Sequence, residues 1–215
     1  MIRRRLISEY FDSKILENNL RGYWCEAMVA AALGKTCKIT SGGWAPWDLQ
    51  IGEDTENFPD RIRMQVKSAA RLQTWHSPGA EASDPIFSLK YRNRPSYWAR
   101  DFPSRSCETS GFLCDIFVLC FHDNSDRSTA DQRDPAQWKV YLLSAHPEDG
   151  DITRDEFAER ERTLNRTGRQ SALQRRPQTM TEGIRGRRPT LALPLGELTS
   201  GAIYQTLYKS RQLIG

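Results

Sequence analysis

The stretch that decides the fold runs from residue 47 to residue 70 and reads WDLQI at 47–51, GEDTENFPD at 52–60 and RIRMQVKSAA at 61–70. Side chains on a β-strand change face at every residue, so we expect Trp47, Leu49 and Ile51 on one face of a first strand. The middle segment is polar and carries Gly and Pro, which is typical of a hairpin connection. The stretch therefore predicts two antiparallel strands.

The polar residues of this hairpin are expected on its other face. Apolar and polar residues alternate from 62 to 67, which groups Arg63, Gln65 and Lys67 together. Pairing of the two strands would bring Asp48 to the same side as Lys67. An acid and an amine on neighbouring strands, with a second acid nearby, suit metal-assisted hydrolysis of a phosphodiester.

The composition is that of a globular protein. The chain has 215 residues, of which 38% are hydrophobic and 27% charged, and we expect one domain over 1–215. No apolar run approaches the length that a bilayer requires, and the basic N-terminus has no signal-peptide core behind it, so we expect a cytoplasmic protein that does not enter a membrane. The five cysteines lack paired spacing, which favours buried free thiols over disulfides or a zinc site.

Positive charge is concentrated in the C-terminal third. The net charge is only +4, but arginines clearly outnumber acids in an arginine-rich segment at 154–190. Such an excess favours a polyanionic partner, with Arg169, Arg175 and Arg176 as candidate contacts. The alternative is a solvated loop. From 168 to 190 we expect a mobile rather than a packed segment.

The N-terminal part is expected to be helical from about residue 8 to residue 33. Apolar residues recur there at spacings of three and four, and Gly34 stands where a helix C-terminal cap is expected. Glu26 lies at the edge of the apolar stripe, so its carboxylate should be half-buried. It is either an ordinary helix acid or a functional one, and the strands that follow supply partners for the second role.

The remaining elements complete an α/β fold with a central mixed sheet flanked by helices. We expect a short strand at 35–39, a loop insertion with one strand at 77–110, a central strand at 111–121, a strand paired with it at 137–143, a helix at 153–165 with Thr153 as N-cap, and a helix at 198–213. Asp115 is either a catalytic acid or a pairing residue at the entrance of the central strand. Arg71, Gln73 and Trp75 either contact a nucleic acid or belong to an ordinary strand extension ending in a surface loop.

In the order of these elements the chain resembles the PD-(D/E)xK nuclease superfamily, which has the restriction-endonuclease-like fold. The segment from Gly22 to Glu26 is similar to the GxxxE opening helix of small resolvase-like members. Asp48 matches the acidic strand, and Gln65-Val66-Lys67 matches the (D/E)xK strand.

The resemblance implies a Mg²⁺-dependent DNA endonuclease, with Mn²⁺ as a substitute metal, in repair, recombination or defence. Asp48 would be the central metal ligand, the Val66 carbonyl a neutral ligand, and Glu26 a ligand directly or through water. Lys67 would position the attacking water and stabilise the charge that develops on the phosphate. Many members act as dimers, so a homodimer is also implied.

Gln65 departs from the family pattern, because it stands where an acid is usual. Its amide oxygen can still bind a metal, and some members of the superfamily resemble this chain in carrying QxK. The alternative is a catalytically inactive module that binds nucleic acid, or a subunit of a larger complex.

Overall fold

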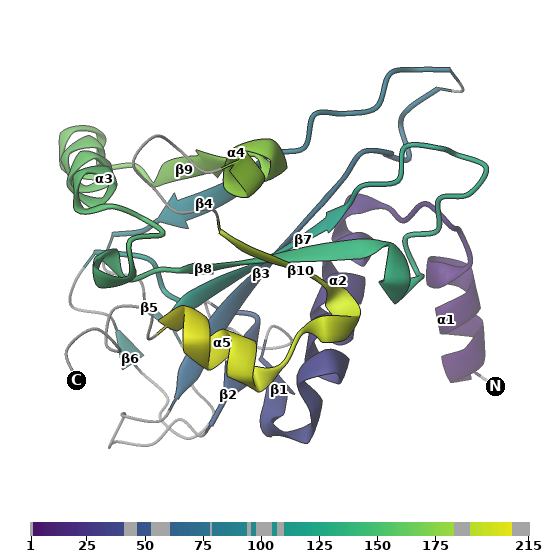
Figure 1. Ribbon diagram of the computed structural model, residues 1–215, viewed down its shortest axis with the longest axis horizontal. Coiled ribbons are helices and arrows are strands. Elements are labelled where there is room, and N and C mark those ends of the chain that lie inside the picture. Colours follow the sequence, from purple (N-terminus) through teal and green to yellow (C-terminus); the bar gives the residue numbers. More distant parts are fainter. Residues whose placement is uncertain are drawn as a thin grey trace.

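The computed structural model describes residues 2–40, 47–52, 61–77, 79–93, 96–97, 105–106, 110–182 and 190–207. Within these ranges a six-stranded sheet forms the centre of the fold, in the order β1-β2-β3-β7-β8-β10 (Figure 1). Its strands are β1 (Cys37–Ile39), β2 (Leu49–Ile51), β3 (Ile62–Ala70), β7 (Ile116–His122), β8 (Trp138–Ser144) and β10 (Leu191–Pro194). Only β3 and β7 pair in parallel; the other neighbours are antiparallel, so the predicted mixed sheet is confirmed.

Two small sheets and five helices complete the described structure. Strand β4 (Phe87–Tyr91) pairs with β9 (Ser171–Arg175), and β5 (Ser96–Tyr97) pairs with β6 (Arg105–Ser106). The α-helices are α1 (Ile2–Phe11), α2 (Asn18–Leu33), α3 (Arg154–Thr167), α4 (Pro177–Glu182) and α5 (Ser200–Leu207). Short 3₁₀ turns occur at Gly34–Thr36, Pro135–Gln137, Pro147–Asp149 and Leu195–Glu197.

The predicted antiparallel pair is confirmed as β2 and β3, while residues 53–60 of the expected connection lie outside the described ranges. The two strands run antiparallel, with Leu49 opposite Met64 and Ile51 opposite Ile62. These four side chains are buried in one cluster with the apolar face of α2. Because side chains alternate along β3, Gln65 must point to the opposite face of the sheet.

The alternation does not extend to Trp47, which was expected beside Leu49 and Ile51. Strand β2 begins only at Leu49, so Trp47 lies in the bend before it. Its indole packs against the guanidinium groups of Arg61 and Arg63, each 5.4 Å from the ring centroid. The strand period therefore fails where the regular strand ends.

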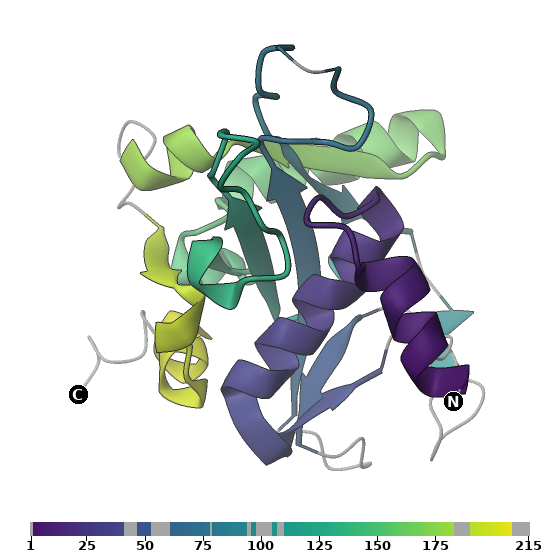
Figure 2. The same cartoon turned by 90° about the vertical axis from the view of Figure 1, so that its right-hand side faces the viewer.

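Different elements cover the two faces of the central sheet. Helices α2 and α5 contribute to the cluster that holds the apolar side chains of β2 and β3. On the other face, side chains of β4, β9 and α4 form a second cluster with alternate residues of β7 and β8, and Phe157 of α3 packs against it. Figures 1 and 2 show α2 on one side of the sheet and the β4–β9 pair with α3 on the other.

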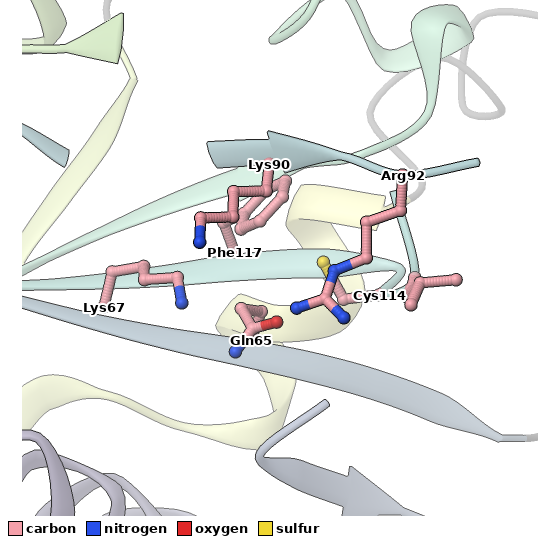
Figure 3. Close-up of a pocket in the computed structure, with 7 residues that line it drawn as sticks. Gln65, Lys67, Lys90, Arg92, Cys114 and Phe117 are labelled. Carbon is pink, nitrogen blue, oxygen red and sulfur yellow. The ribbon is translucent and has the colours of Figure 1, made fainter. Parts of the chain in front are cut away.

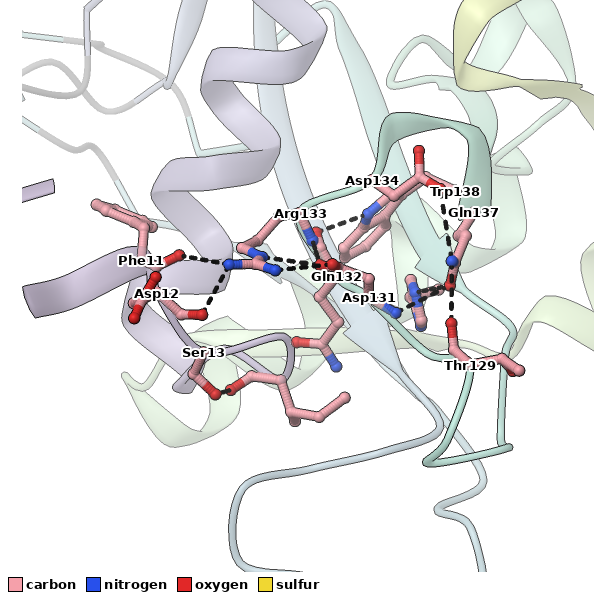
Figure 4. A network of polar contacts seen from close by, with 12 residues as sticks. Phe11, Asp12, Ser13, Thr129, Asp131, Gln132, Arg133, Asp134, Gln137 and Trp138 are labelled. Atoms are coloured by element: carbon pink, nitrogen blue, oxygen red, sulfur yellow. Dashed lines mark hydrogen bonds and ion pairs between the residues drawn. The ribbon is translucent and has the colours of Figure 1, made fainter. Parts of the chain in front are cut away.

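The helix expected from residue 8 to residue 33 is in fact two helices. Helix α1 ends at Phe11, and α2 begins at Asn18 with the carboxylate of Glu17 as its N-cap. A distant loop holds the connection: Arg133 donates to the Asp12 carbonyl at 2.7 Å (Figure 4). The Leu16 N–H donates to the Gln132 side chain at 2.9 Å. These partners lie more than a hundred residues away, so no local pattern announces the break.

The segment from 168 to 190 was expected to be mobile, but its described part is packed. It contains β9 and α4. Arg160 of α3 donates to the Ala172 carbonyl of β9 at 2.7 Å, and Arg175 of β9 pairs with Glu156 at 3.1 Å. Several arginines of the charged run are thus structural. Residues 183–189 lie outside the described ranges.

The other predicted elements are present, but three of them differ in extent or number. The central strand expected from residue 111 begins at Ile116, and the short strand expected at 35–39 is limited to Cys37–Ile39 after a 3₁₀ turn. The segment 77–110 was expected to hold one strand and carries β4, β5 and β6. The central strand and its antiparallel partner are β7 and β8. Thr153 and Glu156 form a complete capping box at the start of α3, and Gly34 ends α2 with φ 78°. The last helix is described to Leu207; the remainder of its expected range, 208–213, lies outside the described residues.

The four described cysteines are free thiols, and Cys25, Cys114 and Cys120 are buried, as expected. None of the described helices combines the length and the apolar character that a bilayer crossing requires.

Candidate functional site

Asp48 is fixed against the middle of β3 by its backbone and by one oxygen of its side chain. Its N–H donates to the Met64 carbonyl at 2.9 Å. The Oδ2 atom accepts a hydrogen bond from the Gln65 Nε2 atom at 2.5 Å and another from the Val66 N–H at 2.8 Å. The carboxylate is therefore held in one orientation beside the Gln65-Val66-Lys67 segment.

The second oxygen of Asp48 is available to a ligand. Both side-chain hydrogen bonds end at Oδ2, and among the described contacts none ends at Oδ1. Burial raises the pKa of Asp48, although the charges of Lys67 and Arg92 and the two hydrogen bonds oppose this effect. A carboxylate that has lost part of its hydration gains strongly from a nearby cation.

Lys67 lies on the same side of the sheet as Asp48, as expected from the alternation. It follows Gln65 by two residues on β3, and its charge is the strongest of the influences that lower the pKa of Asp48. Within the described ranges the amine of Lys67 has no ion-pair or hydrogen-bond partner. It is therefore free to bind an anion.

A small recess opens between β3 and β4 beside this group. Its lining consists of Gln65, Lys67, Lys90, Arg92, Leu113, Cys114 and Phe117. Figure 3 shows that the amines of Lys67 and Lys90 and the guanidinium of Arg92 point into the same recess. The site is thus built from β3, β4 and β7, with further residues from the segments that follow β4 and precede β7.

Lys90 and Arg92 were missed in the sequence analysis. The segment 87–92 alternates, with Phe87, Leu89 and Tyr91 buried and the residues between them more exposed. This period of two could have grouped Lys90 with Arg92 on one face. It could not have shown that the face lies opposite Lys67, because no local signal connects β4 to β3.

The thiol of Cys114 in the recess is not suited to nucleophilic attack. It is fully buried, and burial and the neighbouring Asp115 carboxylate raise its pKa well above the ordinary value. The thiol rather than the thiolate is then present near neutral pH.

Asp115 was expected to be either a catalytic acid or a pairing residue, and the structure shows it as a pairing residue. Its carboxylate accepts from the Arg63 side chain at 2.8 and 3.0 Å and from the Arg63 N–H at 2.7 Å. His146 lies 3.5 Å away on the same carboxylate. Asp115 therefore pairs at the entrance of β7.

The residues present would fit a hard cation through Asp48 and neutral oxygens. Within the part of the chain that the structure describes, no group of three or more His, Cys, Asp or Glu side chains could hold a metal. Among the described contacts, neither the Gln65 Oε1 atom nor the Asp48 Oδ1 atom accepts a hydrogen bond. In an extended strand the N–H and C=O of one residue point to the same side, so the Val66 carbonyl faces the side on which the Val66 N–H binds Asp48. Mg²⁺ accepts few protein oxygens because it keeps several waters.

Glu26 approaches from a different part of the fold. It is half-buried, as expected, and belongs to α2, which covers the face of the sheet opposite Gln65 and Lys67. Its role as a metal ligand stays a prediction.

Of the three residues expected to contact nucleic acid after β3, Trp75 is the one most open to solvent. Its side chain is 62% exposed. Arg71 pairs with Asp123 at 2.7 Å and lies over the ring of Phe121. Gln73 is only 8% exposed; it accepts a hydrogen bond from Arg21 at 2.8 Å. Gln73 therefore holds the end of β3 to α2 and has little surface for a ligand.

The three candidate arginines of the C-terminal segment also differ. Arg169 is exposed. Arg176 is exposed and pairs with Asp84. Arg175 is only 5% exposed and binds Glu156, so its side chain faces the interior and not a polyanion.

Comparisons with known proteins give little further information. No family model matches the chain, and no curated protein matches it. Among solved structures, the bacterial homing endonuclease I-Ssp6803I is similar over 59% of this chain and 68% of its own, with 18% sequence identity and a TM-score of 0.29. At that TM-score we base no argument on the likeness.

Proposed function

We propose that this protein is a metal-dependent DNA endonuclease with a restriction-endonuclease-like core, of the PD-(D/E)xK type in its QxK form. The observation that carries the proposal is the joint placement of Asp48 and Lys67. A fixed carboxylate with one open oxygen stands on the same face as a lysine without an ion-pair partner. This combination suits cleavage of a phosphodiester.

In the proposed reaction a water oxygen forms a bond to phosphorus while the bond from phosphorus to the leaving sugar oxygen breaks. The water loses one proton to solvent, and the leaving oxygen ends as a hydroxyl by taking up a proton. Lys67 is suited to orient the water and to stabilise the negative charge that grows on the phosphate oxygens. Asp48 Oδ1, the Val66 carbonyl and the Gln65 amide oxygen are suited to hold Mg²⁺. Glu26 belongs to the helix over the other face of the sheet, and we propose it as a further ligand directly or through water. When bound, Mg²⁺ would make water more acidic and polarise the phosphate.

DNA is the proposed substrate. The recess brings Lys67, Lys90 and Arg92 together, and phosphate contacts by cationic side chains supply most of the affinity of nucleic-acid binding. A homodimer is proposed because cleavage of both strands requires two sites.

A second candidate function rests on the contact between Gln65 and Asp48. A carboxylate at position 65 would add negative charge for the metal, whereas the amide uses its N–H to bind Asp48 at 2.5 Å. A site of this kind suits a protein that binds nucleic acid without cutting it.

The test is cleavage of supercoiled plasmid by the purified protein in Mg²⁺, in Mn²⁺ and in EDTA. We expect nicked and linear products only with a metal, and a loss of at least about a hundredfold in rate for Asp48→Asn and for Lys67→Ala, as for removal of other groups that stabilise developing charge. Lys35→Ala, on an exposed turn, is the matched control and should cut at the wild-type rate.

Circular dichroism and thermal melts should show that both variants remain folded. Equal cleavage by wild type, Asp48→Asn and Lys67→Ala would contradict the proposed site. Salt-sensitive DNA binding without cleavage in any divalent metal would instead favour the binding module.

A further inference from the structure

Lys90 and Arg92 stand out because neither side chain is neutralised by a direct contact, although the charge of Arg92 is felt by Asp48. Within the described ranges, neither side chain forms an ion pair or a hydrogen bond. Both nevertheless line a recess, together with Lys67. Unpaired cations at one small site repel one another, so the arrangement is stable only if water or an anion screens them.

The segment that carries these cations, β4 with Arg92 directly after it, is firmly anchored. Lys90 stands opposite Ala172 in the β4–β9 pair, and Arg92 exchanges two backbone hydrogen bonds of 2.9 Å with Gly111. The neighbouring Leu89 and Tyr91 are buried. The positions of the two cationic residues are therefore set by the fold before any ligand arrives.

We propose that Lys90 and Arg92 form a phosphate clamp opposite Lys67, which grips one phosphodiester group of a nucleic-acid strand between β3 and β4. This inference rests on the proposed function and adds residues that the sequence motif does not contain. Arg92 contacts two non-bridging oxygens through its planar guanidinium, and Lys90 supplies a point charge from the same strand.

The recess favours phosphate over other anions. It is small and carries three cationic side chains, with Asp48 as the acid beside it. A phosphodiester offers these donors two non-bridging oxygens that share one negative charge, and it still leaves Asp48 a place for a metal. Figure 3 shows the guanidinium of Arg92 directed toward Gln65. Because Gln65 binds Asp48, a phosphate held by the clamp would lie near Asp48.

The test measures binding without cleavage. Fluorescence anisotropy of a labelled duplex is recorded in EDTA over a range of salt concentrations, for wild type, Lys90→Gln, Arg92→Gln and Arg92→Lys. We expect each Gln variant to weaken binding about tenfold at low salt and to reduce the slope of log affinity against log salt by about one. Arg92→Lys should recover the slope but only part of the affinity.

Lys35→Gln is the matched control, because Lys35 lies on an exposed turn. Thermal melts should show that the clamp variants keep their fold. If Lys90→Gln and Arg92→Gln bind the duplex with the affinity and salt slope of Lys35→Gln, the proposal is overturned.

A second arm separates nucleic acid from free phosphate. Inorganic phosphate and a mononucleotide are tested for stabilisation of the same variants against heat. We expect little effect at millimolar concentration, because one phosphate lacks the neighbouring contacts of a strand. Clamp-dependent stabilisation by inorganic phosphate, with unchanged DNA binding, would overturn the assignment to a nucleic acid.

The result is independent of cleavage. Loss of binding in the clamp variants, together with absence of any cutting by wild type, would leave the clamp standing while the proposed nuclease activity fails.

Discussion

From β3, the side chain of Gln65 donates a hydrogen bond of 2.5 Å to the carboxylate of Asp48, which directly precedes β2. The contact joins the two positions that the sequence motif treats as separate ligands. It turns the Gln65 N–H toward Asp48 and leaves both Asp48 Oδ1 and Gln65 Oε1 without a hydrogen bond among the described contacts. The amide therefore orients the acid, and it does so without adding a second negative charge.

Replacing Gln65 by Glu should turn the attraction between positions 65 and 48 into repulsion. The Gln65→Glu variant places two carboxylates side by side, so we expect a loss of about 1–3 kcal/mol in the free energy of unfolding without metal. Added Mg²⁺ should restore the loss, because a cation between two acids removes their repulsion. Thermal melts with and without Mg²⁺ measure both effects.

Gln174→Glu is the matched control, since Gln174 is an exposed amide on β9. It should change little in either condition. An equal response to Mg²⁺ in the two variants would contradict a metal-binding role for position 65.

Loss of the Arg63–Asp115 pair should lower the free energy of unfolding more at neutral pH than at acidic pH. Burial alone would raise the pKa of Asp115, but hydrogen bonds from His146 and Arg63 outweigh it and hold the pKa well below its ordinary range. A carboxyl whose pKa is lower in the folded than in the unfolded protein stabilises the fold at pH values above its unfolded pKa of about 3.9. This stabilisation disappears as the pH falls through the folded pKa. Urea unfolding should show that Asp115→Asn costs about 3–5 kcal/mol at pH 7 and less at pH 3.

The exposed pair of Asp84 and Arg176 serves as a comparison, and Asp84→Asn should cost no more than about 1 kcal/mol. A cost for Asp115→Asn that is equally small at pH 7 would contradict the role assigned to Asp115.

His146 should titrate above the ordinary histidine value. The hydrogen bond to Asp115 raises its pKa, against the opposing effect of burial. A histidine whose pKa is higher in the folded than in the unfolded protein stabilises the fold at pH values below its unfolded pKa of about 6.5. This stabilisation is lost as the pH rises through the folded pKa. The side chain is half-exposed, so the effect on stability should be small. An NMR titration should show the raised pKa in wild type and its return toward 6.5 in Asp115→Asn; an unchanged pKa in that variant would rule out this cause.

Two arginines of the charged segment should behave differently. Arg175 is buried against Glu156, so Arg175→Ala should lower the free energy of unfolding by about 3–5 kcal/mol. Arg169 is exposed, so Arg169→Ala should leave stability unchanged and reduce the salt slope of DNA binding by about one. Denaturant unfolding and salt-dependent binding separate the two. A stable Arg175→Ala protein would contradict the structural role.

The sequence was informative wherever a local period sets which side chains are buried. The alternation at 62–67 correctly placed Lys67 on the polar face, and the spacing of Thr153 and Glu156 correctly announced the start of α3. Both signals depend on residues close in the chain.

It was not informative where distant partners decide the structure. The break between α1 and α2 depends on Gln132 and Arg133. Strand β9 lies in an arginine-rich segment that resembles a solvated loop, yet Arg160 and Arg175 are bound within the fold. Lys90 enters the candidate site through the packing of β4 against the sheet, a relationship that no short motif expresses.

The location of a bound metal tests the central claim most directly. Anomalous diffraction from a crystal soaked in Mn²⁺ should show a peak at about 2.0–2.3 Å from Asp48 Oδ1, with the Val66 carbonyl among its ligands. The same soak of Asp48→Asn should show a much weaker peak. Absence of any metal at Asp48 in the wild-type crystal at saturating Mn²⁺ would contradict the account.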